Sequence, residues 1–148
     1  MSMRTTYLAQ GHWPKRTSVL TGDSLLVGDV GRPDLLVGDQ AVDGMDVEHR
    51  SMTQFCCIRD KLLTLPDHVE VYPGHYGRSA CGGINMSGKA SSTIYFEKRH
   101  NLPMRQPKPE IFAEFVRETS KPLPENFRFM KSRNLGLGDG SEETKAFE

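Results

Sequence analysis

The segment from Thr21 to Leu35 constrains the fold of this chain more than any other segment. Its fifteen residues hold the apolar run 25–27, three glycines, one proline and three aspartates. Glycine and proline at this density predict short strands joined by tight turns and a loop, with strands at 18–20 and 25–27. Asp23 follows the first of these strands, where a carboxylate held by the sheet can bind or bridge metal ions. The alternative is an Asx turn, in which the Asp23 side chain bonds to its own loop.

The rest of the chain alternates predicted helices and strands. Apolar residues at helical spacing predict a helix over 46–64 with a core-facing stripe at Phe55, Ile58, Leu62 and Leu65. A strand is predicted next, over 69–72, followed by a helix over 92–99 with Glu97 on its solvated side. Another helix is predicted over 109–119; it starts at a proline and buries residues 111, 112, 115 and 116. Long loops are expected over 28–44 and 73–91. This order predicts an α/β (α+β) fold.

Length and composition exclude several classes of protein. The 148 residues suit one main domain, which we place at 17–137, between a poorly ordered segment 1–16 and a polar tail 138–148. Lys plus Arg and Asp plus Glu both number 19, so no overall field attracts nucleic acid or a membrane surface. No apolar run approaches the ~18 residues of a membrane span. Three cysteines, two of them adjacent, disfavour a secreted disulfide framework and favour a cytoplasmic location.

Histidines and a cysteine accompany Asp23 as candidates for chemistry. His75 follows strand 69–72 and the rigid pair Pro73-Gly74, so it and Asp23 are expected to converge at one edge of a sheet. A structural or surface role is the alternative for any single histidine. His12 is a third candidate ligand.

Cys56 and Cys57 are expected to be buried and inert in the helix, and Cys81, in a glycine loop without a matched partner, is a weak candidate for redox chemistry.

Three further residues are candidate substrate contacts. Arg32 flanks Pro33 with Asp34, an arrangement typical of an ion pair that stabilises a loop or supports a site. Arg99 can meet an anionic substrate tail, or it can belong to a solvated helix face. Tyr72, at the end of strand 69–72, is the third candidate substrate contact.

Four motifs in chain order resemble one known family. They are LTGDSLLVGDVGRPDL, LLTLPDHVEVYPGHYG, SSTIYFEKRHNL and PLPENFRFMKSRNLG. Residues 17–137 resemble the C-terminal half of the metallo-β-lactamase-fold superfamily, nearest to the branch of glyoxalase II and the persulfide dioxygenases. The resemblance implies a partial αββα sandwich, with Asp23 as the carboxylate ligand and His75 as the late histidine ligand of zinc or iron. It also implies glutathione-linked thiol or thioester substrates.

The family's His-x-His-x-Asp-His signature does not occur in these 148 residues. We therefore expect a truncated hydrolase or dioxygenase that is inactive alone, and that self-associates or pairs with a complementary N-terminal fragment. A non-catalytic remnant that acts as an oligomerising or interaction module is the alternative. A small metal-free domain that binds an anion through loops 28–44 and 74–88 is a third reading.

Overall fold

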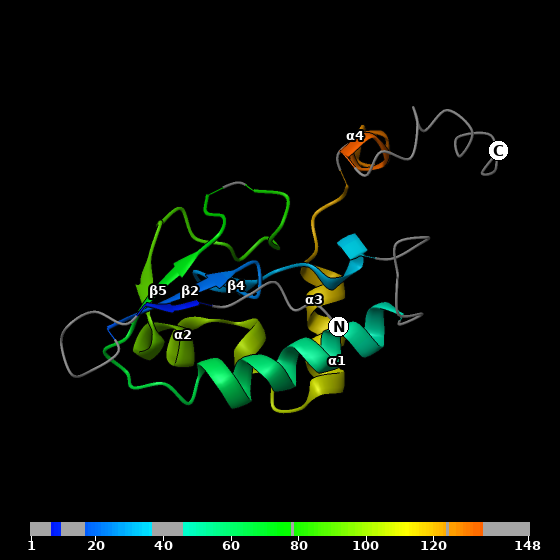
Figure 1. Ribbon diagram of the computed structural model, residues 1–148. Coiled ribbons are helices and arrows are strands. Elements are labelled where there is room, and N and C mark those ends of the chain that lie inside the picture. Colours follow the sequence, from blue (N-terminus) through cyan, green and yellow to red (C-terminus); the bar gives the residue numbers. More distant parts are fainter. Residues whose placement is uncertain (1–6, 10–16, 37–45, 78, 124, 135–148) are drawn as a thin grey trace.

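A central four-stranded sheet organises the part of the chain that the structure describes. The computed structural model describes residues 7–9, 17–36, 46–77, 79–123 and 125–134 (Figure 1). His12, a candidate ligand, lies outside these ranges. The sheet has the order β1-β2-β5-β6, with β1 at Tyr7–Ala9, β2 at Ser18–Gly22, β5 at Glu70–Pro73 and β6 at Ser92–Thr93. β2 and β5 run parallel, and each pairs with an antiparallel neighbour. The strand β1 was not predicted from the sequence.

The two central strands have one buried and one exposed face. Val19 pairs with Val71 and Leu20 pairs with Tyr72 in the parallel register. The two valines are fully buried, whereas Leu20 and Tyr72 are 44% and 41% exposed. Successive side chains of a strand point to opposite faces, so the valine face meets the core and the Leu20–Tyr72 face is open in the described structure.

The predicted loop from residue 28 onward begins instead with a hairpin. β3 at Leu25–Leu26 pairs antiparallel with β4 at Asp29–Val30, and η1 at Pro33–Leu36 follows as a 3-10 helix. Gly28 turns the hairpin with φ of +78°, a conformation that other residues adopt at a cost. The strand predicted over 25–27 is present as β3, whereas β4 was not predicted because two residues carry too little alternation to be recognised in a sequence.

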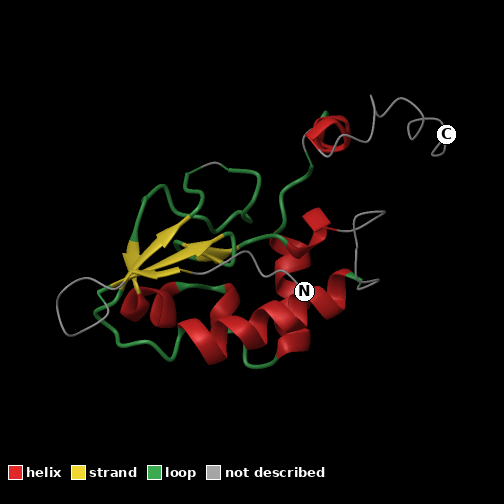
Figure 2. Ribbon diagram, in the orientation of Figure 1, coloured by secondary structure: helices red, strands yellow, loops and turns green. Residues whose placement is uncertain are grey.

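Helices cover the buried face of the sheet (Figure 2). α1 spans Val47–Cys57, and Asp46 caps it by accepting the His49 backbone N–H at 2.8 Å. The chain continues as a π-helix, η2, at Ile58–Leu62, so the helix predicted over 46–64 is confirmed but changes its winding near Cys57. α2 spans Ile94–His100, η3 Pro103–Arg105, α3 Pro109–Thr119 and α4 Phe127–Asn134; α4 was not predicted.

The core joins these helices to the sheet. Phe55 of α1 packs against Phe112 of α3 with ring centroids 5.1 Å apart, and the predicted stripe at 55, 58, 62 and 65 is buried. On α3 the prediction holds for Phe112 and Val116 and is wrong for Ile111, which is 42% exposed, because only one face of α3 meets α1. None of the described helices is long and apolar enough to cross a membrane.

A buried polar network fastens the hairpin to α2. Glu97 is fully buried, contrary to the prediction that it is solvated. Its carboxylate accepts hydrogen bonds from the Ser92 hydroxyl at 2.5 Å, the Asn101 amide at 2.8 Å and the Gly28 backbone N–H at 3.1 Å. Asn101 also donates to the Asp29 carbonyl at 2.8 Å. One carboxylate thus satisfies donors from three separate segments, because Glu97 shares its helix face with the buried Ile94.

Candidate metal site

Asp23 and His75 meet at the end of the two parallel strands. Asp23 follows β2 and His75 lies two residues beyond β5, so the parallel pairing brings both to the same sheet edge. The Gly74 backbone N–H donates to the Gly22 carbonyl at 2.8 Å and continues the ladder past the strands. The Asp23 Oδ1 and the His75 Nδ1 lie 2.5 Å apart, although 52 residues separate them in sequence. The expected convergence is confirmed.

Tight backbone packing fixes the position of Asp23. The Ser24 N–H bonds to the Thr21 carbonyl at 3.0 Å, and Gly22 adopts φ of +54° within this turn. Gly31 lies directly against the turn, since a Cβ there would stand 1.8 Å from the Asp23 carbonyl oxygen. A Cβ on Gly74 would stand 3.3 Å from the Asp23 Oδ1. Gly31 therefore lets a second backbone segment approach the Asp23 main chain, and Gly74 lets the segment after β5 approach the Asp23 carboxylate.

Cys81 is the third potential ligand at this edge. One ligand atom each from Asp23, His75 and Cys81 all lie within 4.8 Å of one another. An isolated antiparallel bridge joins Gly31 to Gly82, and the Arg32 N–H donates to the Cys81 carbonyl at 3.0 Å. From the sequence, Cys81 is only a weak candidate for redox chemistry, and the one signal of its position is Gly82 next to it, which permits the close bridge to Gly31. Cys56 is exposed and Cys57 half-buried, so the prediction that both are buried is wrong.

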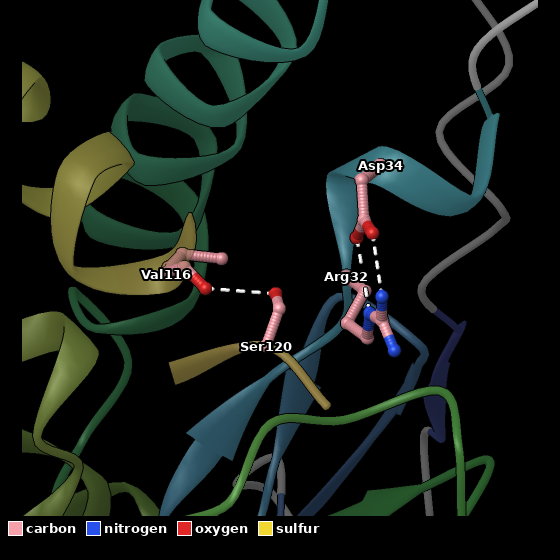
Figure 3. Close-up of polar contacts among 4 residues, drawn as sticks. All are labelled: Arg32, Asp34, Val116 and Ser120. Atoms are coloured by element: carbon pink, nitrogen blue, oxygen red, sulfur yellow. Dashed lines mark hydrogen bonds and ion pairs between the residues drawn. The ribbon is translucent and has the colours of Figure 1, made fainter. Parts of the chain in front are cut away.

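Arg32 forms a bidentate ion pair with Asp34 beside the site (Figure 3). Its Nε and Nη2 atoms contact the two Asp34 carboxylate oxygens at 3.0 and 2.6 Å. The Arg32 side chain is only 3% exposed, and its Nη1 has no hydrogen-bond partner within the described structure. The loop ion pair expected from the sequence is present. Figure 3 also shows the Ser120 hydroxyl donating to the Val116 carbonyl at the end of α3.

The other two candidate substrate contacts are exposed. The Tyr72 hydroxyl donates to the Glu70 carboxylate at 2.9 Å, and this bond raises the pKa of Tyr72 above its usual value. Arg99 lies on α2, with its guanidinium 4.6 Å from the centre of the Tyr95 ring. Substrate contact by Arg32, Tyr72 and Arg99 stays a prediction.

A second buried carboxylate supports the loop that carries Cys81. Asp29 Oδ2 accepts the Asn85 backbone N–H at 3.1 Å, and its Oδ1 accepts the Val30 N–H at 2.8 Å. Burial raises the pKa of Asp29 above its ordinary value, and these backbone bonds oppose the rise. A Cβ on Gly83 would stand 2.9 Å from Asp29 Oδ2, so the loop lies closely against the hairpin.

Comparison with known proteins supports the family suggested by the motifs. The chain is 27% identical to a metallo-β-lactamase from Staphylococcus aureus subsp. aureus COL, with a TM-score of 0.65 over 83% of this chain and 32% of that protein. It is 29% identical to ETHE1 from Myxococcus xanthus, with a TM-score of 0.54 over 73% of this chain and 39% of that one. The chain is therefore similar in both sequence and structure to members of the metallo-β-lactamase-fold superfamily. Its mixed α/β architecture corresponds to part of the metallo-β-lactamase fold, as predicted.

A curated relative agrees with this family, and no family model matches the chain. The relative is the probable metallo-hydrolase YqgX of Bacillus subtilis (strain 168), 36% identical over 78 residues, which are 47% of this chain and 32% of the relative. The chain thus spans about a third of the length of the metallo-β-lactamase-fold relatives that it matches.

The donor set at the sheet edge fits the metal that these relatives imply. A carboxylate, an imidazole and a thiol are ligands of zinc, and carboxylate with imidazole also suits non-haem iron. All three side chains are at least partly accessible to solvent, so a metal ion can reach them.

Proposed function

We propose that this chain carries part of the metal centre of a metallo-β-lactamase-fold hydrolase or persulfide dioxygenase-like protein that acts on glutathione-linked thiol or thioester substrates. One observation carries the proposal: Asp23 and His75 are brought within 2.5 Å by the pairing of two strands that are distant in sequence. In a member of this superfamily, convergence of these two side chains at a sheet edge indicates a shared ligand function more than a chance surface contact.

The residues of the site have separate roles in this proposal. Asp23 and His75 hold zinc or iron, which when bound polarises a substrate carbonyl or activates water or oxygen. Arg32, whose Nη1 has no hydrogen-bond partner among the described residues, and the exposed Tyr72 and Arg99 contact the substrate. A glutathione moiety carries carboxylates, which guanidinium groups bind well. We also propose a cytoplasmic location, in keeping with three free cysteines.

In this proposal, full activity requires further ligands from outside these 148 residues. Either a second copy of the chain or a complementary N-terminal fragment provides them. The open Leu20–Tyr72 face is the surface on which such a segment would complete the layered fold.

Metal binding tests the proposal directly. We expect metal-stripped protein to bind zinc or, under anaerobic conditions, iron(II), and Asp23→Ala to weaken this binding by at least about tenfold, because a ligand is lost. Titration calorimetry and elemental analysis measure affinity and stoichiometry. Asp60→Ala is the matched control, since Asp60 is exposed on η2. Equal affinity of wild type and Asp23→Ala would contradict the assignment.

Activity assays address the substrate class. Hydrolysis of a glutathione thioester by the zinc-loaded chain and oxygen uptake with glutathione persulfide by the iron-loaded chain distinguish the two branches. We expect either activity to require the missing ligands, and therefore to rise when a complementary fragment is added. No activity with or without such a fragment, despite bound metal, would exclude both substrate classes.

The open sheet face favours a second candidate function, an oligomerising or interaction module without catalysis. Leu20 and Tyr72 place two large side chains side by side on this face. Size-exclusion chromatography with light scattering tests it: a monomer of 16.6 kDa would count against obligate self-association.

A further inference from the structure

Cys81 lies where a third ligand of the Asp23–His75 site would lie. We infer that its thiolate is that ligand, so that this chain alone presents a carboxylate–imidazole–thiolate site for a borderline-soft divalent cation such as zinc. The inference rests on the proposed function, because it assumes that Asp23 and His75 bind metal. It goes beyond that function by naming a ligand of different chemistry.

Three segments of the chain converge at this site. Asp23 follows β2, His75 follows β5, and Cys81 lies in the loop after β5, yet one ligand atom from each fits within 4.8 Å. The loop is held by the Gly31–Gly82 bridge and by the bond from the Arg32 N–H to the Cys81 carbonyl. The Cys81 backbone is thus held against Gly31 and Arg32, and Gly31 in turn packs against the Asp23 carbonyl.

The spacing requires only a small contraction on metal binding. Zinc bonds of about 2.0 to 2.3 Å place tetrahedral ligand atoms about 3.3 to 3.8 Å apart. The largest separation in the cluster is 4.8 Å or less, so a side-chain rotation closes the difference. The Asp23 Oδ1 and the His75 Nδ1, which are 2.5 Å apart, would have to separate to hold a metal ion between them.

The chemistry of the three donors selects among metals. A thiolate favours zinc and other borderline or soft cations over magnesium, calcium and manganese. Three protein ligands leave a fourth tetrahedral position open, which is the arrangement of catalytic rather than structural zinc sites. The chain would therefore bind zinc without a histidine-rich loop.

Cobalt(II) substitution tests the inference by spectroscopy. We expect the reduced, metal-stripped chain to bind one equivalent of cobalt(II) and to develop a sulfur-to-cobalt charge-transfer band in the near ultraviolet. Cys81→Ser should lose this band and bind zinc at least about tenfold more weakly in competition with a chromophoric chelator. Cys56→Ser, which changes an exposed cysteine on α1, should keep both properties.

The outcomes separate this inference from the proposed function. A cobalt complex that needs Asp23 but shows no charge-transfer band overturns the thiolate ligand and leaves the proposed function standing. A band that persists in Asp23→Ala and disappears in Cys81→Ser contradicts the role of Asp23 instead. Absence of cobalt and zinc binding overturns both. Because Cys81→Ser can disturb the loop, cadmium-113 NMR of the wild-type chain gives a second measurement: a shift typical of oxygen and nitrogen ligands alone overturns the inference.

Discussion

Gly31→Ala is expected to lower the free energy of unfolding of this chain by about 3 kcal/mol, the upper part of the range for inserting a group into packed structure. The new Cβ would stand 1.8 Å from the Asp23 carbonyl oxygen and 2.9 Å from its carbonyl carbon. Both are backbone atoms, so no rotation of a side chain relieves the clash. Either the Asp23 turn or the strand-like segment at Gly31 has to move, and in the second case the bridge to Gly82 is disturbed as well.

Two other glycines provide a graded control for this substitution. A Cβ on Gly82 would meet the Met86 Sδ at 2.7 Å and the Leu26 Cδ1 at 2.8 Å, which are ends of flexible side chains, so Gly82→Ala should cost less than Gly31→Ala. Gly88 has open space around it, so Gly88→Ala should change stability by no more than about 0.5 kcal/mol. Urea unfolding followed by circular dichroism measures all three variants. A Gly31→Ala midpoint equal to that of Gly88→Ala would show that the turn is not packed as described.

Glu97→Ala is the second substitution with a large expected effect, also about 3 kcal/mol. It removes the acceptor of three hydrogen bonds and leaves the Gly28 N–H, the Ser92 hydroxyl and part of the Asn101 amide without it in a buried site. Glu114→Ala is the matched control, because Glu114 is exposed on α3 and its contact with Arg117 is 3.9 Å long. Equal urea midpoints for Glu97→Ala and Glu114→Ala would contradict the network.

The effect of the neutral substitution Glu97→Gln on the free energy of unfolding should depend on pH. Burial raises the pKa of Glu97 above its ordinary value of 4.5, although the bonds from Ser92, Asn101 and Gly28 oppose the rise. The folded state therefore binds this proton more tightly than the unfolded state, and the resulting stabilisation is complete below pH 4.5 and is lost as the pH rises through the raised pKa. Glu97→Gln has no such proton. The free energy of unfolding of wild type relative to Glu97→Gln should therefore fall as the pH rises above 4.5, and a relative stability that rises with pH would be inconsistent with a raised pKa.

Local sequence patterns predicted most of the helices and, in the candidate site, the pair Asp23 and His75. Pro109 at a first helical turn and an apolar stripe at helical spacing were enough for α3 and α1. The meeting of Asp23 and His75 followed from two strands that each end at a candidate ligand. The strand predicted over 25–27 is present as β3, but β4 and the hairpin that it completes were missed because β4 has only two residues. Glu97 and Cys81 were missed because their surroundings come from distant segments: Glu97 bonds to Gly28, 69 residues away, and Cys81 depends on the Gly31–Gly82 bridge.

The parallel pairing of β2 and β5 also determines when the candidate metal site can form during folding. Asp23 and His75 are 52 residues apart, and α1 has to cross over before the two strands can pair. Contacts of such long sequence separation form late, because the entropy of closing the intervening loop is lost before the contact stabilises it. The unfolded chain therefore has no preassembled pair of ligands with which to capture an ion. We expect metal to enter a protein that has already folded, and its binding to slow unfolding rather than to speed folding.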